Sequence, residues 1–146
     1  MECPPRRHRL IALRPRFLLD THIIVRWLSE SARLSREQAR VLNDATRTGE
    51  PVALSGISLL EIAVLFARGR HRMKSTPAEL LGTLDDNPAF QVLPITVDIA
   101  TEVATMGGTL SDPADRAIVA TARVHRLRLI TSDQRIIESR LVAIVD

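Results

Sequence analysis

The sequence predicts a single α/β domain in which helices cover both faces of a parallel central sheet, giving a three-layer α/β/α sandwich. Its 146 residues are the length of one ordinary domain. From Arg16 onward, short apolar runs alternate with segments of helical periodicity. Strands and helices that alternate in this way form parallel sheets buried on both faces. The content of 45% hydrophobic and 25% charged residues is that of a globular protein.

The expected elements follow one another with short connections. Along the chain they are a strand at 16–20, helices at 21–30 and 34–50, a strand at 51–55, helices at 57–69 and 76–87, a strand at 90–96, helices at 97–106 and 113–126, a strand at 127–131, a short helix or irregular turn at 133–140 and a strand at 141–145.

Residues at the ends of the predicted helices support these bounds. Ser35 is a favourable N-cap with Gln38 three residues later, and Gly49 follows the end of the same helix. Thr76 and Asp112 are N-caps of two later helices, because each precedes a proline, which is favoured at the first helical position.

Basic residues are concentrated at the N-terminus. The chain has a net charge of +3, whereas residues 1–16 hold five arginines and one glutamate and therefore carry +4. Residues 17–146 thus sum to −1. We predict that residues 1–15 are a flexible basic tail and that residues 16–146 form the folded domain. Such a tail either binds phosphates by counterion release or is a solvated or upstream-initiated extension.

The composition also indicates a cellular setting. The single cysteine, Cys3, has no partner for an internal disulfide, which fits a reducing cytoplasm. No apolar stretch approaches the roughly 20 residues of a membrane span. Three Phe, one Trp and no Tyr offer few rings for stacking on single-stranded bases. We expect a cytoplasmic protein without a membrane segment.

Four acidic residues stand in apolar surroundings, where a solvated carboxylate is not expected. Asp20 ends the first predicted strand, and Asp133 follows the strand at 127–131. Glu61 and Asp115 lie on helices whose residues three and four positions further along are apolar, so both acids belong to apolar helix faces. The carboxyl ends of parallel strands are where such sheets bind ligands.

Gathering four carboxylates is unfavourable without a cation. Two like charges about 4 Å apart repel by roughly 4 kcal/mol at an effective dielectric constant of about 20. No basic residue follows the same apolar stripes. Mg²⁺ and Mn²⁺ bind carboxylate oxygens and water, and such a site can activate water against a phosphodiester. The four acids are therefore candidate ligands of one or two Mg²⁺ or Mn²⁺ ions.

Each acid also has an ordinary structural explanation. Asp20 could equally be a helix N-cap, and Asp133 could begin a turn. Asp112 is a natural cap beside Pro113, whereas Asp115 faces the apolar stripe of the same helix. Glu61 is the hardest to explain structurally, since an exposed Glu belongs on a polar face. The four together outweigh the separate explanations.

Five segments also carry a family resemblance by their order and spacing: LLDTHIIVRWL, SGISLLEIAVLFARG, LPIT, DPADRAIVATA and LITSDQRI. They resemble the signature segments of PIN domains, and most of all those of VapC-type ribonuclease toxins from bacterial toxin–antitoxin pairs. The resemblance covers residues 16–146. The third segment departs from the usual His-Arg-Asp-Pro-Phe-Asp-Arg pattern, because TLSDPADR lacks the His-Arg pair and has Ala114 in place of Phe. This departure concerns substrate contacts more than metal binding.

The resemblance implies a small Rossmann-like (PIN-like) sandwich with a Mg²⁺ or Mn²⁺ site at one end of its sheet. It implies a metal-dependent endoribonuclease that leaves 5′-phosphates and acts as a toxin. The implied partners are the RNA substrate, a VapB-like antitoxin in the active-site groove, and a second copy in a homodimer or toxin–antitoxin hetero-oligomer. By position, the catalytic and metal-binding residues are Asp20, Glu61, Asp115 and Asp133, with Thr131, Asp112 and Arg116 in supporting places.

Two alternatives remain open on the same fold. One is a non-catalytic PIN-like module that binds RNA or a protein, against which the complete set of four acids argues. The other is a phosphoesterase that acts on DNA or on small phosphate esters, which the nearly neutral domain does not exclude. Ile23, Trp27 and Leu65 are candidates either for a partner surface or for the core.

Overall fold

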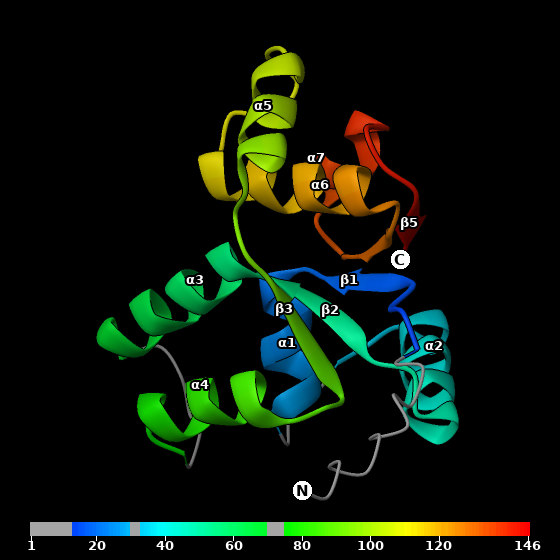
Figure 1. The fold of residues 1–146 in the computed structure, drawn as a ribbon, viewed down its shortest axis with the longest axis vertical. Coiled ribbons are helices and arrows are strands. Elements are labelled where there is room, and N and C mark those ends of the chain that lie inside the picture. Colours follow the sequence, from blue (N-terminus) through cyan, green and yellow to red (C-terminus); the bar gives the residue numbers. More distant parts are fainter. Residues whose placement is uncertain (1–12, 30–32, 70–74) are drawn as a thin grey trace, which may run out of the picture.

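The computed structural model of the chain describes residues 13–29, 33–69 and 75–146 (Figure 1). The predicted tail therefore lies outside the described residues up to position 12, and Cys3 with it. Within the described ranges the elements are β1 (Phe17–Leu19), α1 (Thr21–Leu28), α2 (Arg36–Thr48), β2 (Val52–Ser55), α3 (Gly56–Ala67), α4 (Pro77–Asp86), β3 (Phe90–Leu93), α5 (Val97–Thr105), α6 (Pro113–His125), β4 (Arg128–Ile130), α7 (Gln134–Ser139) and β5 (Ile144–Val145).

The strands form one parallel sheet in the order β3-β2-β1-β4-β5. β1 is central, and its Leu19 is in register with Leu54 of β2 on one side and with Ile130 of β4 on the other. The chain builds outward from β1 through β2 to β3, and then returns to add β4 and β5 on the opposite side. The strand order therefore reverses between β1 and β4. In open parallel sheets, ligands bind beyond the carboxyl ends of the strands at this point.

Side chains alternate across the sheet and divide the core into two layers. In β1, Phe17 and Leu19 point into a core shared with α1, α2 and α4, whereas Leu18 points into a core shared with α5, α6 and α7. Figure 1 shows α5 and α6 on one side of β1, and α1 and α4 on the other. The predicted three-layer α/β/α sandwich is therefore confirmed.

Helix α3 packs in more than one direction, although it leaves the apolar side chains of Leu60 and Val64 exposed. It contacts α1 and α4, and it also contacts α6. Its Ile62 lies in the core with α1 and α4, while Ile57 packs against the core with α6. This position between the layers accounts for the half-burial of Glu61, one residue before Ile62.

The outer strands are shorter than the sequence predicts. β3 ends at Leu93 rather than at 96, because its only neighbour, β2, ends at Ser55, the register partner of Leu93. The next residue, Pro94, has no N–H to extend a ladder. β5 covers Ile144–Val145 rather than 141–145, because it pairs only with the short strand β4.

The predicted cap residues Ser35, Gly49, Thr76 and Asp112 are confirmed, although most helices are up to two residues shorter at their ends than predicted. Ser35 and Gln38 form a capping box at the start of α2, and Gly49 ends that helix in the left-handed conformation, with φ 73°. Asp112 caps α6, and the segment at 133–140, left open between helix and turn, forms helix α7.

Of the three residues assigned to either core or partner surface, Ile23 is fully buried in the core. Trp27 is partly buried against the same core, with its ring edge-on to Phe90 at 5.7 Å between centroids. Leu65 is half-buried. Among the described residues, no helix has both the length and the apolar character needed to cross a membrane.

Candidate active site

Asp20 stands at the point where the strand order reverses, directly after β1, and the residue is only 4% exposed. Its backbone N–H donates to the carbonyl of Ile130 at 3.0 Å, which continues the pairing with β4. Oδ1 accepts the N–H of Thr21 at 2.7 Å, so Asp20 caps α1. Oδ2 accepts the Thr131 hydroxyl at 2.6 Å. The cap explanation is therefore correct for Oδ1, while Oδ2 turns toward the end of β4.

Thr131 links the two acids that follow the strands. Its side chain is fully buried, and its hydroxyl donates to Asp20 and accepts the backbone N–H of Asp133 at 3.1 Å. Asp133 in turn caps α7. Both strand-end acids are thus oriented by one buried hydroxyl group, which has no exposed surface left for a substrate.

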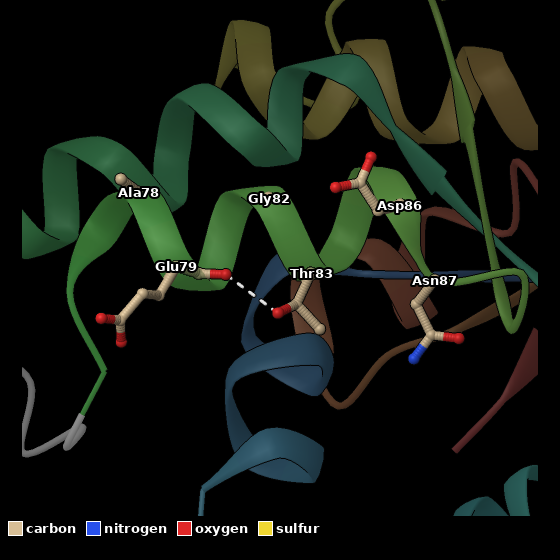
Figure 2. A pocket seen from close by; sticks show the side chains of 6 residues that line it. All are labelled: Ala78, Glu79, Gly82, Thr83, Asp86 and Asn87. Atoms are coloured by element: carbon tan, nitrogen blue, oxygen red, sulfur yellow. Dashed lines mark hydrogen bonds between the residues drawn. The ribbon is translucent and has the colours of Figure 1, made fainter.

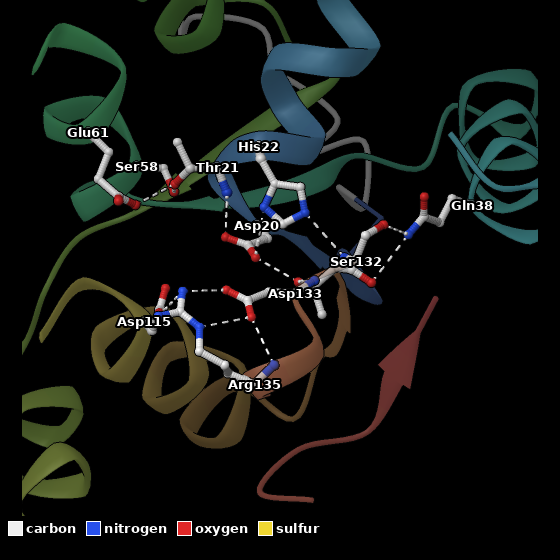
Figure 3. A network of polar contacts seen from close by, with 11 residues as sticks. Asp20, Thr21, His22, Gln38, Ser58, Glu61, Asp115, Ser132, Asp133 and Arg135 are labelled. Carbon is white, nitrogen blue, oxygen red and sulfur yellow. Dashed lines mark hydrogen bonds and ion pairs between the residues drawn. The ribbon is translucent and has the colours of Figure 1, made fainter. Parts of the chain in front are cut away.

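His22 contacts Asp20 on its other side, and their proximity along the chain is the only sign of this contact in the sequence. Nε2 of His22 accepts the backbone N–H of Ser132 at 3.2 Å, so the ring proton must lie on Nδ1. Nδ1 lies 3.2 Å from Oδ2 of Asp20, within the distance of an electrostatic contact. Figure 3 shows the imidazole between the Asp20 carboxylate and the loop that follows β4.

Gln38 supports the same loop from α2. It is fully buried, and its amide nitrogen donates to the Thr131 carbonyl at 3.2 Å and to Oγ of Ser132 at 3.0 Å. Its amide oxygen accepts the backbone N–H of Ser35 at 3.1 Å. The first turn of α2 therefore fixes the loop that carries Thr131 and Asp133. Since Gln38 and Thr131 lie 93 positions apart, sequence pattern alone could not reveal this contact.

Glu61 projects from α3 toward the start of α1 (Figure 3). Oγ1 of Thr21 lies 2.6 Å from Oε1 of Glu61 and 2.8 Å from Oγ of the buried Ser58. With one proton on each hydroxyl, Ser58 donates to Thr21 while Thr21 donates to the carboxylate. Burial raises the pKa of Glu61, as do the charges of Asp20 and Asp112, and the Thr21 hydrogen bond offsets part of this rise.

Asp115, in the first turn of α6, is the acid with the largest resolved change. Burial is the main cause that raises its pKa to about 6, with further contributions from the charges of Asp112, Asp20 and Asp133. These repulsions place Asp115 in the same electrostatic site as the strand-end acids. Asp112 accepts the N–H groups of Ala114 and Asp115 at 2.8 and 3.3 Å, so it is the cap of α6.

Two arginines lie near these acids in different ways. Arg135 of α7 pairs with Asp133 at 3.0 Å and reaches Asp115 at 3.7 Å. The Asp133 carboxyl accepts hydrogen bonds from Arg135, which hold its pKa below the ordinary value. Arg116 donates instead to the carbonyl of Leu110 at 2.5 Å and to that of Gly107. The guanidinium of Arg116 thus holds the turn before α6, and its supporting place in the site stays a prediction.

The arrangement brings all four predicted acids to one end of the sheet. As the side chains stand, the described residues contain no group of three or more His, Cys, Asp or Glu side chains that could hold a metal ion. The donor chemistry nevertheless suits a hard cation, because the acids offer carboxylate oxygens and the pKa values of Glu61 and Asp115 are raised. Burial is the main cause of both increases and repulsion adds to it, and a bound cation would offset both effects after local rotation of side chains.

A shallow hollow of about 450 Å³ lies elsewhere, along α4 (Figure 2). Its lining comes from the first turn of α4 to the residue after its end: Ala78, Glu79, Gly82, Thr83, Asp86 and Asn87. The hydroxyl of Thr83 donates to the carbonyl of Glu79 in the same helix at 2.9 Å. None of the four acids lines this hollow, so it is separate from the candidate active site.

Comparison with known proteins agrees with the fold and with the order of the motifs. The family model of the PIN domain matches residues 17–140. Ribonuclease VapC22 of Mycobacterium tuberculosis (strain ATCC 25618 / H37Rv) is 33% identical over 120 residues, which cover 82% of this chain and 88% of that protein.

Solved structures with the same fold include FitAcB from Neisseria gonorrhoeae, with a TM-score of 0.65 and 24% identity over 89% of this chain and 96% of that chain. A toxin–antitoxin complex from Klebsiella pneumoniae has a TM-score of 0.61 and 25% identity over 88% of this chain and 95% of that chain. The family match spans most of the sequence and includes the positions of all four acids. This chain therefore belongs to the PIN-domain family.

Proposed function

We propose that the protein is a metal-dependent endoribonuclease that acts as the toxin of a toxin–antitoxin pair. The observation that carries this proposal is the convergence of Asp20, Glu61, Asp115 and Asp133 at the point where the strand order reverses, with the pKa values of two of them raised by burial and mutual repulsion. Membership of the PIN family and the likeness to a ribonuclease support RNA as the substrate.

The four acids would hold one or two Mg²⁺ or Mn²⁺ ions through carboxylate oxygens. A divalent ion bound there would lower the pKa of bound water, and its positive charge would stabilise the negative charge that develops on the phosphodiester. Asp20 is the best oriented of the four, because the Thr21 N–H donates to its Oδ1 and the Thr131 hydroxyl donates to its Oδ2. Thr131, being buried, acts on the reaction through Asp20 and Asp133 rather than by touching RNA.

The proposed partner is a VapB-like antitoxin, which would occupy the active-site groove of a homodimer or hetero-oligomer in the cytoplasm. The likeness to a toxin–antitoxin complex at 25% identity over most of both chains supports this assignment. The antitoxin must be removed before activity is measured, because a bound partner would hide the nuclease.

Cleavage assays on the purified, antitoxin-free protein test the proposal. End-labelled structured and unstructured RNAs are incubated with Mg²⁺, Mn²⁺ or EDTA, using the wild type, Asp20→Asn and Asp115→Asn. Losing a group that merely orients a metal ligand costs roughly 10- to 100-fold. Loss of a ligand itself should therefore reduce cleavage by at least about 100-fold.

Asp85→Asn is the matched control, since Asp85 is an exposed acid on α4 and the chemical change is identical. It should cleave like the wild type, and thermal unfolding should show that all variants are folded. Equal cleavage by the wild type and both site variants, or cleavage that persists in EDTA, would contradict the proposal. RNA binding without cleavage would favour the non-catalytic module, and activity only on DNA or small phosphate esters would favour the other phosphoesterase.

A further inference from the structure

Arg135 is a cation that already occupies part of the acidic site. Its guanidinium forms a fork on Asp133, with Nε 3.3 Å from Oδ1 and Nη2 3.0 Å from Oδ2. The same Nη2 lies 3.7 Å from Oδ2 of Asp115. Figure 3 shows the guanidinium between these two carboxylates, which come from different helix ends. No other arginine of the described residues forms an ion pair with any of the four predicted acids.

Helix stability does not explain this cation. Arg135 is in the first turn of α7, where the partial positive charge of the helix end favours acids and disfavours bases. Its side chain is also 70% exposed, so packing holds little of it in place. The carboxylates of Asp133 and Asp115 are the groups that attract it, and both lie on the side of Arg135 that faces the site.

The contacts of Arg135 use the oxygens that a metal ion would need. Both carboxylate oxygens of Asp133 accept hydrogen bonds from the Arg135 side chain, and Oδ1 also accepts its backbone N–H at 2.9 Å. A forked Arg–carboxylate pair fixes the orientation of the carboxylate. While the pair is intact, Asp133 is turned toward α7, which agrees with the absence of a ready group of three ligands among the described residues.

We propose that Arg135 is a built-in counter-cation that competes with the divalent metal ion for Asp133 and Asp115. In the metal-free protein its guanidinium neutralises the two carboxylates, and metal binding requires it to leave them for solvent. This inference rests on the proposed metal site. The competition weakens the affinity for the metal ion and stabilises the metal-free protein.

Titration of the metal-free protein with Mn²⁺ tests the inference without any activity assay. Binding is followed by calorimetry and by the electron paramagnetic resonance spectrum of free Mn²⁺. Arg135→Gln should bind Mn²⁺ about two- to fivefold more tightly than the wild type, because the competing pair is lost and exposed ion pairs are weak. Its metal-free form should unfold at a lower temperature, and Mn²⁺ should raise that temperature by more than it does in the wild type. Arg135→Lys, which keeps the charge without the fork, should have an intermediate affinity.

Arg140→Gln provides the matched control, since Arg140 is exposed at the other end of α7 and the change in net charge is the same. It should bind Mn²⁺ like the wild type. If Arg135→Gln and Arg135→Lys bind Mn²⁺ no more tightly than Arg140→Gln, the inference is wrong while the metal site stands. If neither the wild type nor any arginine variant binds Mn²⁺, the proposed metal site is wrong, and the competition with it.

Discussion

The two walls of the candidate active site differ in how their acids are held. Asp20 and Asp133 follow strands β1 and β4, and donors surround their oxygens: backbone N–H groups, the Thr131 hydroxyl and a guanidinium. Glu61 and Asp115 project from α3 and α6 with fewer donors. Glu61 accepts one hydroxyl, and Asp115 has only the more distant contact with Arg135.

The acids of the two walls are therefore stabilised in different ways. We call Asp20 and Asp133 the strand wall, and Glu61 and Asp115 the helix wall. Hydrogen bonds to an ionised carboxylate stabilise it and fix its direction. The strand wall has such bonds because backbone pairing places Asp20 beside Thr131. On the helix wall, burial and repulsion raise the pKa values of Glu61 and Asp115. The strand wall is therefore fixed in direction before any metal binds, whereas the ionised acids of the helix wall become favourable only with a cation. Removing the hydroxyl shared on the strand wall should lower stability, whereas removing the charge of Asp115 from the helix wall should raise the stability of the metal-free protein.

The largest effect is expected from Thr131→Val, which removes the hydroxyl shared by both strand-end acids. The change leaves one oxygen of Asp20 and the backbone N–H of Asp133 without this partner in a buried place. An unsatisfied buried group costs about 1–3 kcal/mol, so we expect the free energy of unfolding to fall by about 2–3 kcal/mol. Metal affinity should fall by roughly 10- to 100-fold. Urea unfolding and Mn²⁺ titration measure the two quantities.

Thr121→Val is the control for that experiment. Thr121 is equally buried, but its hydroxyl donates to the carbonyl of Ala117 in its own helix, at 2.6 Å. That carbonyl keeps its helical environment, so the same substitution should cost much less there and should leave metal affinity unchanged. Equal losses of stability in the two variants would show that the shared hydroxyl has no special role.

Asp115→Asn should have the opposite sign in the metal-free protein. The folded-state pKa of Asp115 is raised from 3.8 to about 6, so its contribution to stability is fully present below about pH 4 and is lost as the pH rises through about 6. The asparagine variant has no carboxyl group at this position, so it does not lose this stability as the pH rises. With allowance for solvent screening, it should be more stable than the wild type at about pH 7.5 by on the order of 1 kcal/mol.

Urea unfolding in EDTA at about pH 4, 6 and 7.5 checks this prediction, with Asp85→Asn as the exposed control. Addition of Mn²⁺ sharpens it, because the ion should stabilise the wild type more than the variant and so reverse their order. A variant that is less stable than the wild type at every pH, with or without metal, would mean that Asp115 is an ordinary structural acid.

The sequence predicted the fold well because the fold depends on local signals. Caps such as Ser35 and Asp112 and the stop at Gly49 are read from neighbouring residues, and they are confirmed. Strand lengths were overestimated at β3 and β5. The apolar pattern of an edge strand continues beyond its neighbour, whereas its hydrogen bonds cannot.

The candidate site was predicted only in part. The acids stand out in the sequence, because a carboxylate in an apolar pattern is locally anomalous. Their supports do not stand out, since Gln38 in a capping box and Arg135 in a short helix both have ordinary local explanations. Gln38 contacts Thr131, and Arg135 contacts Asp115. Both contacts join segments that are distant in sequence and that only the fold brings together. Sequence patterns therefore identify candidate ligands better than the groups that orient them.

The smallest effect is expected on the helix wall from Thr21→Val, which removes the hydroxyl that donates to Glu61. That hydrogen bond lowers the pKa of Glu61, so its loss should raise the pKa further, and ¹³C NMR of the Glu61 carboxyl measures the change. This half-buried acid can take up a proton instead of remaining buried and charged, but the buried Ser58 hydroxyl also loses its partner, so stability should fall by about 1 kcal/mol, the lower end of the cost of an unsatisfied buried group. The same threonine-to-valine change at Thr131 should cost more, since Asp20 is almost fully buried. An unchanged Glu61 titration, or a loss as large as that at Thr131, would mean that both walls are preorganised alike.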